Sequence, residues 1–280
     1  MAVPRSLLFV PGDRPDRMAK ALASGADALI LDLEDAVAPG AKPAARRAVA
    51  EFLASPRSVT LFVRINPLGS GLAEEDLDAV LPARPDGIVL PKAEGGATLA
   101  ALDARLSGDV MILPIATETP AAIFALGSYG GVTPRLAGLT WGAEDLPAAI
   151  GAATSRESDG GYTAPYQLAR SVTLFGAHAA GVAAIETVYP DFRDLDGLAA
   201  YAARGRRDGF VGMMAIHPTQ VPIINAAFTP SVQEVAQAQA IVALFAANPG
   251  AGALSLDGRM VDAPHLKAAQ ALLARAGLAG

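Results

Sequence analysis

The chain has 280 residues, 52% of them hydrophobic, so it is long enough to bury a large core in one domain or two smaller ones. Its 28 acidic and 22 basic side chains give a formal charge of −6, which argues against a general surface for nucleic acid or anionic membranes. Cysteine is absent, which excludes disulfides, thiolate nucleophiles and zinc–thiolate sites and agrees with a reducing compartment.

The N-terminal stretch "MAVPRSLLFVPGD" has no basic region followed by a long apolar run. No window of the chain reaches the roughly 18 uncharged apolar residues that a membrane span needs. We therefore expect neither a signal peptide nor a transmembrane helix, and we expect a cytoplasmic protein.

Eight short apolar runs recur along the chain, and most of them end on Gly, Pro or a charge: 6–13, 28–35, 60–67, 87–94, 110–120, 136–145, 183–190 and 213–218. Stretches rich in Ala and Leu lie between most of them, at 16–25, 43–55, 97–106 and 166–181. Apolar strands that alternate with helices predict a parallel sheet covered by helices. Eight repeats of this unit favour an α/β fold of the (β/α)8 TIM-barrel type over the alternative, an open doubly wound sheet.

The pattern changes after the eighth run. Residues 228–280 read as two helices joined by a Gly-rich turn and a short strand-like stretch, 252–262. We expect residues 1–227 to form the barrel with its catalytic mouth, and 228–280 to form an appended segment that covers its own or a neighbouring active site. The basic stretch 203–209 is interpreted as a solvated helix end.

Polar residues follow the predicted strands, at the barrel end where active sites lie. Glu118 and Asp145 come from successive strands, and two carboxylates at one rim repel each other unless a cation lies between them. With no Cys and few His, the natural cation is a hard ion such as Mg²⁺. The alternative is that each carboxylate caps the helix that follows it, and the residues alone leave both open.

Arg64 ends its predicted strand and could bind the carboxylate of a substrate through two parallel hydrogen bonds. Its alternative is a structural ion pair with Glu34 or Asp35. Lys92 has the same two interpretations, a contact with the substrate or a structural ion pair. A Schiff-base role is disfavoured because Lys92 lies among acids. No His has the partners of a Ser-His-Asp triad, and no phosphate-binding fingerprint follows a strand.

Eight motifs, in order, carry a resemblance: "RSLLFVPGDRPDRM", "ALILDLEDAV", "VRINP", "LPKAE", "ETP", "WGAEDL", "AIHPTQV" and "LDGRMVDAPHLKAAQ". Together they resemble the citrate lyase β-subunit family, in the HpcH/HpaI aldolase/citrate lyase superfamily, with its relatives the malyl-CoA and citramalyl-CoA lyases. The match covers nearly the whole chain. Two departures are Met213, where relatives often carry Lys, and a C-terminus shorter than that of malyl-CoA lyases.

The resemblance implies a TIM barrel and Mg²⁺-dependent cleavage of a 3-hydroxyacyl thioester to a 2-oxo acid and acetyl-CoA or a related thioester. It implies that Glu118 and Asp145 bind the metal and that Arg64 holds the acid. It also places the substrate-binding Gly142, Ala143 and Glu144 at the site. From the residues themselves we expect Glu34, Asp35 and Lys92 to surround it. Glu34 could orient Arg64 or a Mg²⁺-bound water, and its alternative is a salt bridge to Arg5 or Lys92.

The resemblance also assigns an acid/base role to Asp262, which reaches a neighbouring subunit's mouth, and it implies a homo-oligomer, a trimer or a hexamer. The thioester could be carried by CoA or by an acyl-carrier protein. The alternatives are a thioesterase or synthase with the same enolate chemistry, a non-catalytic subunit that binds acyl-carrier protein, and phosphoryl transfer on pyruvate or phosphoenolpyruvate.

Overall fold

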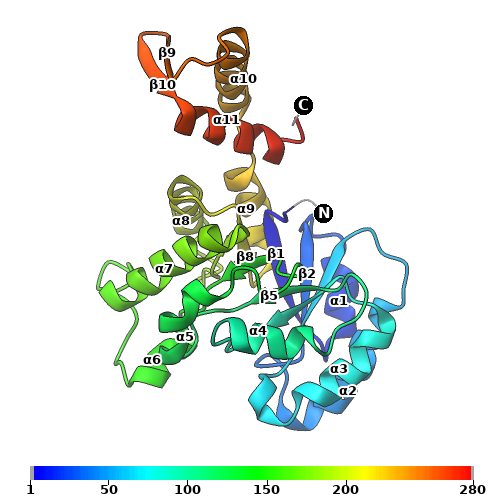
Figure 1. The fold of residues 1–280 in the computed structure, drawn as a ribbon. Coiled ribbons are helices and arrows are strands. Elements are labelled where there is room, and N and C mark those ends of the chain that lie inside the picture. Colours follow the sequence, from blue (N-terminus) through cyan, green and yellow to red (C-terminus); the bar gives the residue numbers. More distant parts are fainter. Residues whose placement is uncertain (1–2, 279–280) are drawn as a thin grey trace. The chain divides into compact units, whose positions relative to one another are not determined.

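The computed structural model describes residues 3–278, and its centre is one sheet of eight parallel strands (Figure 1). The strands are β1 Ser6–Pro11, β2 Ala28–Asp32, β3 Thr60–Arg64, β4 Gly87–Leu90, β5 Met111–Pro114, β6 Gly138–Thr140, β7 Ala183–Glu186 and β8 Gly212–Ala215. Their order is β5-β4-β3-β2-β1-β8-β7-β6.

The two end strands of this order, β5 and β6, meet and close the sheet. Backbone bridges join Ile112 to Leu136 and Ile115 to Thr140, and the N–H of Ala116 donates to the carbonyl of Thr140 over 2.9 Å. Closure removes both sheet edges. The predicted (β/α)8 barrel is therefore confirmed, and the open doubly wound sheet is wrong.

Helices follow the strands and surround the barrel: α1 Pro15–Ala21, α2 Lys42–Leu53, α3 Ala73–Val80, α4 Gly96–Asp103, α5 Pro120–Ala125, α6 Asp145–Ile150, α7 Ala164–Ala180, α8 Leu195–Asp208 and α9 Val221–Phe228. Their ends follow from local chemistry. Asp194 caps α8 by accepting from the N–H of Gly197 over 2.9 Å. Gly181 ends α7 with a φ of 72°, which favours glycine.

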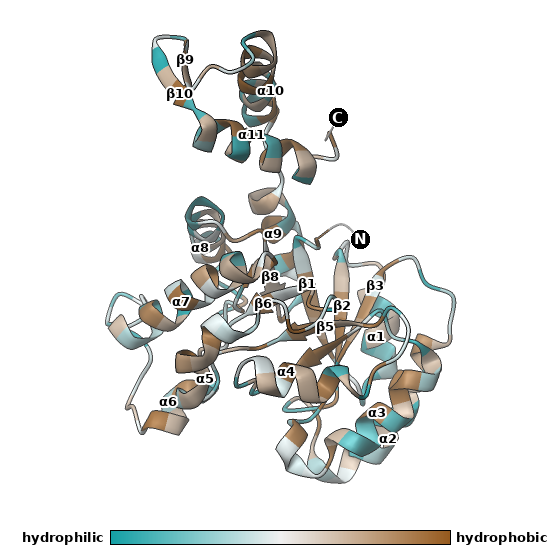
Figure 2. Cartoon of the chain, viewed as in Figure 1, coloured by the Kyte–Doolittle hydropathy of each residue, from teal (hydrophilic) through white to brown (hydrophobic). Residues whose placement is uncertain are grey.

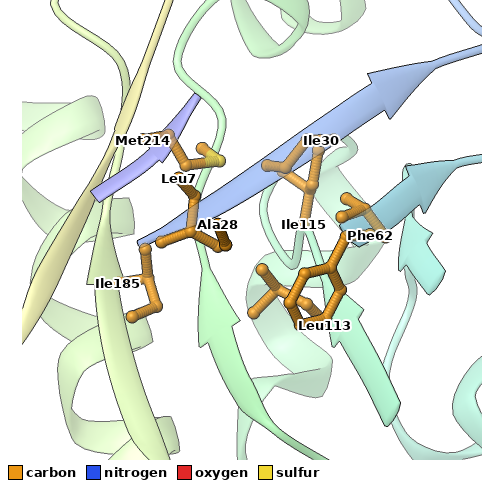
Figure 3. Close-up of a cluster of buried hydrophobic side chains, with 9 residues drawn as sticks. Leu7, Ala28, Ile30, Phe62, Leu113, Ile115, Ile185 and Met214 are labelled. Carbon is orange, nitrogen blue, oxygen red and sulfur yellow. The ribbon is translucent and has the colours of Figure 1, made fainter. Parts of the chain in front are cut away.

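The barrel interior is packed with apolar side chains from strand positions that point inward (Figure 3). Ala28 and Ile30, two residues apart on β2, share this face because strand side chains alternate. Met214 and Ile185 meet them from β8 and β7. Figure 2 shows α2 and α3 with both hydrophilic and hydrophobic segments, as expected of helices with one face on the sheet and the other in water.

The described residues divide into two compact units, one spanning residues 4–227 and one comprising Val3 and 228–278. The second contains α10 Val232–Ala247, the antiparallel strands β9 Ala253–Leu256 and β10 Arg259–Asp262, and α11 Ala263–Arg275. Asp257 and Gly258 join the strands with positive φ angles, as a tight hairpin requires. Ala238, Ile241, Val261, Ala269 and Leu273 form a core of its own.

No helix among residues 3–278 is long and apolar enough to cross a membrane.

Candidate active site

Glu118 and Asp145 follow β5 and β6 at the same end of the barrel. Glu118 is 5% exposed, and its Oε2 accepts the backbone N–H of Lys92 over 2.6 Å. Thr119, not Glu118, caps α5 by accepting from the N–H of Ala122. Asp145 is the first residue of α6, whose N-cap, Glu144, forms no side-chain cap. The capping alternative therefore does not account for either carboxylate.

The electrostatics of this acid pair favour a cation. Burial, together with the charges of Asp145 and Glu34 and a hydrogen bond with Asp145, raises the pKa of Glu118 to about 8. A divalent cation between the two carboxyl groups would relieve the repulsion. Within residues 3–278 no group of three or more His, Asp and Glu side chains could hold a metal. Two carboxylates fit Mg²⁺, which retains several waters and substrate oxygens.

Arg64 lies beside the acid pair and is held by two other acids. Its Nε and Nη2 donate to the two oxygens of Asp32 over 2.7 and 2.6 Å, and its Nη1 lies 2.9 Å from Glu34 Oε2. Burial works to lower the pKa of Arg64, but Asp32 and Glu34 raise it above its usual range. The alternative left open for Arg64, an ion pair with Glu34, is thus present, but the main partner of Arg64 is Asp32.

Asp32 was not singled out as a site residue from the sequence. It is 1% exposed and pairs in register with Arg64, so the two side chains lie at the same level on neighbouring strands. The signal that could have found it is that register, because residues opposite each other in parallel strands point to the same face.

Lys92 connects Glu34 to the acid pair. Its Nζ lies 2.7 Å from Glu34 Oε1 and 3.6 Å from Asp145 Oδ2. Burial works to lower the pKa of Lys92, but these acids raise it above its usual range, so the amine stays protonated and is no Schiff-base nucleophile. Asp35 is exposed and acts on Glu34 only through its charge.

The turn after β6 is held by Thr117. Its hydroxyl accepts from the N–H of Gly142 and donates to the carbonyl of Gly142, both over 3.0 Å. A Cβ at Gly142 would lie 2.9 Å from the Cγ of Glu118, so this glycine makes room for the Glu118 side chain. The N–H groups of Ala143 and Glu144 precede α6, where a helix leaves its donors without an intrahelical acceptor.

A buried polar network braces the same turn from β7, and the sequence did not reveal it. Glu186 is fully buried and accepts from Trp141 Nε1 over 2.5 Å, from Tyr201 over 2.9 Å and from Arg170 over 2.7 Å. Arg170 also pairs with Asp208. The available signal was an acid at the end of a predicted apolar strand, in "AIETVYP".

A pocket of about 510 Å³ lies beside the carboxyl end of β1, between α1 and the segment after β8. Arg14, Arg17 and Lys20 line it with one acid, Asp16. His217 lines it too and stacks on Phe192, with ring centroids 4.9 Å apart. The pocket was not expected from the sequence, because no phosphate-binding motif marks it.

Asp262 belongs to the C-terminal unit, where it is the N-cap of α11. Its Oδ1 lies 2.5 Å from His265 Nδ1, and this hydrogen bond holds the pKa of the Asp262 carboxyl below its usual range.

Known proteins resemble this chain over nearly all of its length. A Mycobacterium tuberculosis citrate lyase subunit beta-like protein is 39% identical over 96% of this chain and 94% of its own. The (3S)-malyl-CoA thioesterase of Cereibacter sphaeroides is 34% identical over 97% and 94%. The mitochondrial citramalyl-CoA lyase of Rattus norvegicus is 32% identical over 95% and 84%.

Solved structures of similar proteins also match most of this chain. Protein CitE from M. tuberculosis, in complex with magnesium, acetoacetate and coenzyme A, superposes with a TM-score of 0.83 at 36% identity, covering 99% of this chain and 98% of that one. The M. tuberculosis citrate lyase beta subunit with oxaloacetate and magnesium gives a TM-score of 0.74 at 37% identity, over 82% and 98%. The model of the HpcH/HpaI aldolase/citrate lyase family matches residues 5–218. The resemblance seen in the motifs is thereby confirmed, and the chain belongs to the HpcH/HpaI aldolase/citrate lyase family.

Proposed function

We propose that this protein is a Mg²⁺-dependent carbon–carbon lyase that cleaves a 3-hydroxyacyl-CoA thioester to a 2-oxo acid and a shorter acyl-CoA. The observation that carries the proposal is the pair of carboxyl groups on Glu118 and Asp145. Lys92 contacts both Asp145 and Glu34, and Glu34 in turn contacts Arg64. Relatives with magnesium and oxaloacetate or coenzyme A support it.

Each residue of the mouth has a role in this reaction. The chemistry that a Mg²⁺ on Glu118 and Asp145 supplies is a lower pKa for the substrate hydroxyl and stabilisation of the negative charge that develops on it. Arg64 and the N–H groups of Ala143 and Glu144 hold the carboxylate of the oxo acid. Asp32, Glu34 and Lys92 keep Arg64 and the metal-binding carboxylates in place.

The shorter acyl thioester leaves as an enolate and needs a proton at its α-carbon. Asp262 is the proposed donor, and in the reverse direction the same carboxylate removes that proton. It acts at a neighbouring subunit's mouth, so the active protein is a homo-oligomer, a trimer or a hexamer.

The basic pocket beside β1 supports CoA over an acyl-carrier protein as the thioester carrier. Three cations against one acid suit the phosphates of a nucleotide, and the ring of His217, which stacks on Phe192, offers a flat surface for its base. Met213 is fully buried in β8, and the positive charge at this pocket comes from Arg14, Arg17 and Lys20.

The test is a panel of malyl-, citramalyl- and citryl-CoA assayed with and without Mg²⁺. We expect one thioester to yield a 2-oxo acid and an acyl-CoA, and we expect chelation to stop the reaction. If the protein binds oxaloacetate with Mg²⁺ but turns over none of the panel, a non-catalytic role replaces the lyase.

A second candidate is a thioesterase that uses the same site. The identity to a (3S)-malyl-CoA thioesterase favours it. Product analysis separates the two functions, because free malate with free CoA means hydrolysis, whereas glyoxylate with acetyl-CoA means lyase activity.

A further inference from the structure

Asp262 and His265 form a hydrogen-bonded pair at the start of α11. His265 Nδ1 lies 2.5 Å from Asp262 Oδ1, while the backbone contacts of the pair are long: 3.5 Å from His265 N to Oδ1 and 3.4 Å from Asp262 N to Nδ1. Hydrogen bonds to a carboxylate strengthen as they shorten. The contact between the two side chains is therefore the main interaction of the pair.

This pair goes beyond what a helix cap requires. In a capping box the residue at this position is ordinarily Glu or Gln, which accepts the backbone N–H of the N-cap. A ring nitrogen carries either a hydrogen or an accepting lone pair, so His265 Nδ1 cannot serve the backbone and the carboxylate at once. At 2.5 Å from an ionised carboxylate, Nδ1 carries the hydrogen and donates it to Asp262.

The other carboxylate oxygen is left for chemistry. Within residues 3–278, the hydrogen bonds that the Asp262 side chain forms all use Oδ1. Both side chains are partly open to solvent, with 34% of Asp262 and 51% of His265 exposed. The hydrogen bond from His265 also lowers the pKa of Asp262, which favours the ionised carboxylate that removes a proton in the reverse, bond-forming direction.

We infer that His265 is a positioning residue whose Nδ1–H orients the Asp262 carboxylate so that Oδ2 can take a proton from the α-carbon of an acyl thioester. This inference rests on the acid/base role proposed for Asp262. In the step, the C–H bond breaks, the proton passes to Oδ2, and the electron pair remains on the thioester as its enolate. In the cleavage direction the step runs in reverse: Asp262 starts protonated on Oδ2, the electron pair of the enolate forms the C–H bond with that proton, and Asp262 is left as the carboxylate.

The experiment measures kcat and KM of the full chain with its preferred CoA thioester and Mg²⁺. His265→Ala removes the donor, and His265→Asn restores an N–H near the position of Nδ1. We expect kcat to fall about tenfold or more in the Ala variant, with KM for the thioester unchanged, since loss of alignment affects the proton transfer and not substrate binding. The Asn variant should recover most of the lost kcat.

Ser231→Ala is the matched control, because Ser231 is the N-cap of α10 in the same unit and also forms a capping box. It should lower the melting temperature as much as His265→Ala and leave kcat within about twofold of the parent.

The inference is overturned if His265→Ala keeps the parental kcat, or if His265→Asn is as slow as the Ala variant. Asp262→Ala separates this failure from a failure of the proposed function. Full activity of that variant contradicts the acid/base role itself. Loss of activity there, with full activity in His265→Ala, contradicts the positioning role alone.

Discussion

Two groups of charged side chains lie at the barrel mouth and differ in how their charge is balanced. In the first group, Arg64 lies within hydrogen-bond distance of Asp32 and Glu34. Lys92 lies within hydrogen-bond distance of Glu34, so two cations balance two acids. At Glu118 and Asp145, two acids face each other, and the ammonium of Lys92 lies 3.6 Å from Asp145. Removing one partner from a buried, balanced group of charges destabilises the fold, whereas an excess of one sign marks a candidate site for a ligand of opposite charge.

The largest effect is expected from Asp145→Asn, which removes one charge from the unbalanced group. We expect activity to fall by about a thousandfold or more, because a proposed metal ligand is lost. Steady-state turnover with saturating Mg²⁺ checks this. Asp35→Asn is the control, since it removes an exposed acid from the same rim. Comparable activity in the two variants would exclude the metal site.

Asp32→Asn should break the balanced group and cost stability. It leaves the guanidinium of Arg64, 12% exposed, without its bidentate partner, and we expect the free energy of unfolding to fall by about 3–5 kcal/mol. Glu118→Gln should leave the stability of the metal-free protein nearly unchanged at pH 7, since burial raises the pKa of Glu118 to about 8 and the group is already largely neutral. Chemical denaturation of both variants measures the contrast. Equal losses would mean that the two groups do not differ.

Arg17→Ala tests whether the basic pocket, where positive charge is in excess, binds a negatively charged ligand. Losing one charged contact to a phosphate should raise KM for the CoA thioester about tenfold and leave kcat nearly unchanged. Arg207→Ala, at an exposed position of α8, is the control. A thioester of pantetheine, which lacks the nucleotide, should respond to neither change; if it responds to Arg17→Ala, the pocket does not bind the phosphates.

The smallest effect is expected from Tyr201→Phe in the Glu186 network. It removes one of several donors to a buried carboxylate, so the free energy of unfolding should fall by about 1 kcal/mol. Thermal unfolding checks this. A loss of several kcal/mol would show that Glu186 depends on this hydroxyl more than on Arg170.

The sequence predicts the barrel and the acids at its mouth. The spacing of the apolar runs identifies the strands, and the carboxyl ends of these strands share one rim. The sequence could not supply what depends on register and distance. Asp32 is not predicted as a site residue, because its pairing with Arg64 depends on the alignment of β2 with β3. Glu186 contacts Trp141, 45 residues away, and no local pattern predicts that contact. No sequence pattern shows that the missing Cβ of Gly142 makes room for Glu118.

Lys92 has a left-handed backbone, with a φ of 50°, and this conformation lets one residue contact both groups at the mouth. Its N–H binds Glu118 while its ammonium binds Glu34, which in turn contacts Arg64. A cation that draws Glu118 toward itself pulls on the backbone of Lys92 and, through Glu34 and Arg64, on the proposed site for the oxo acid. We therefore expect the metal and the oxo acid to bind cooperatively, and thermodynamic linkage requires each to raise the affinity for the other by the same factor.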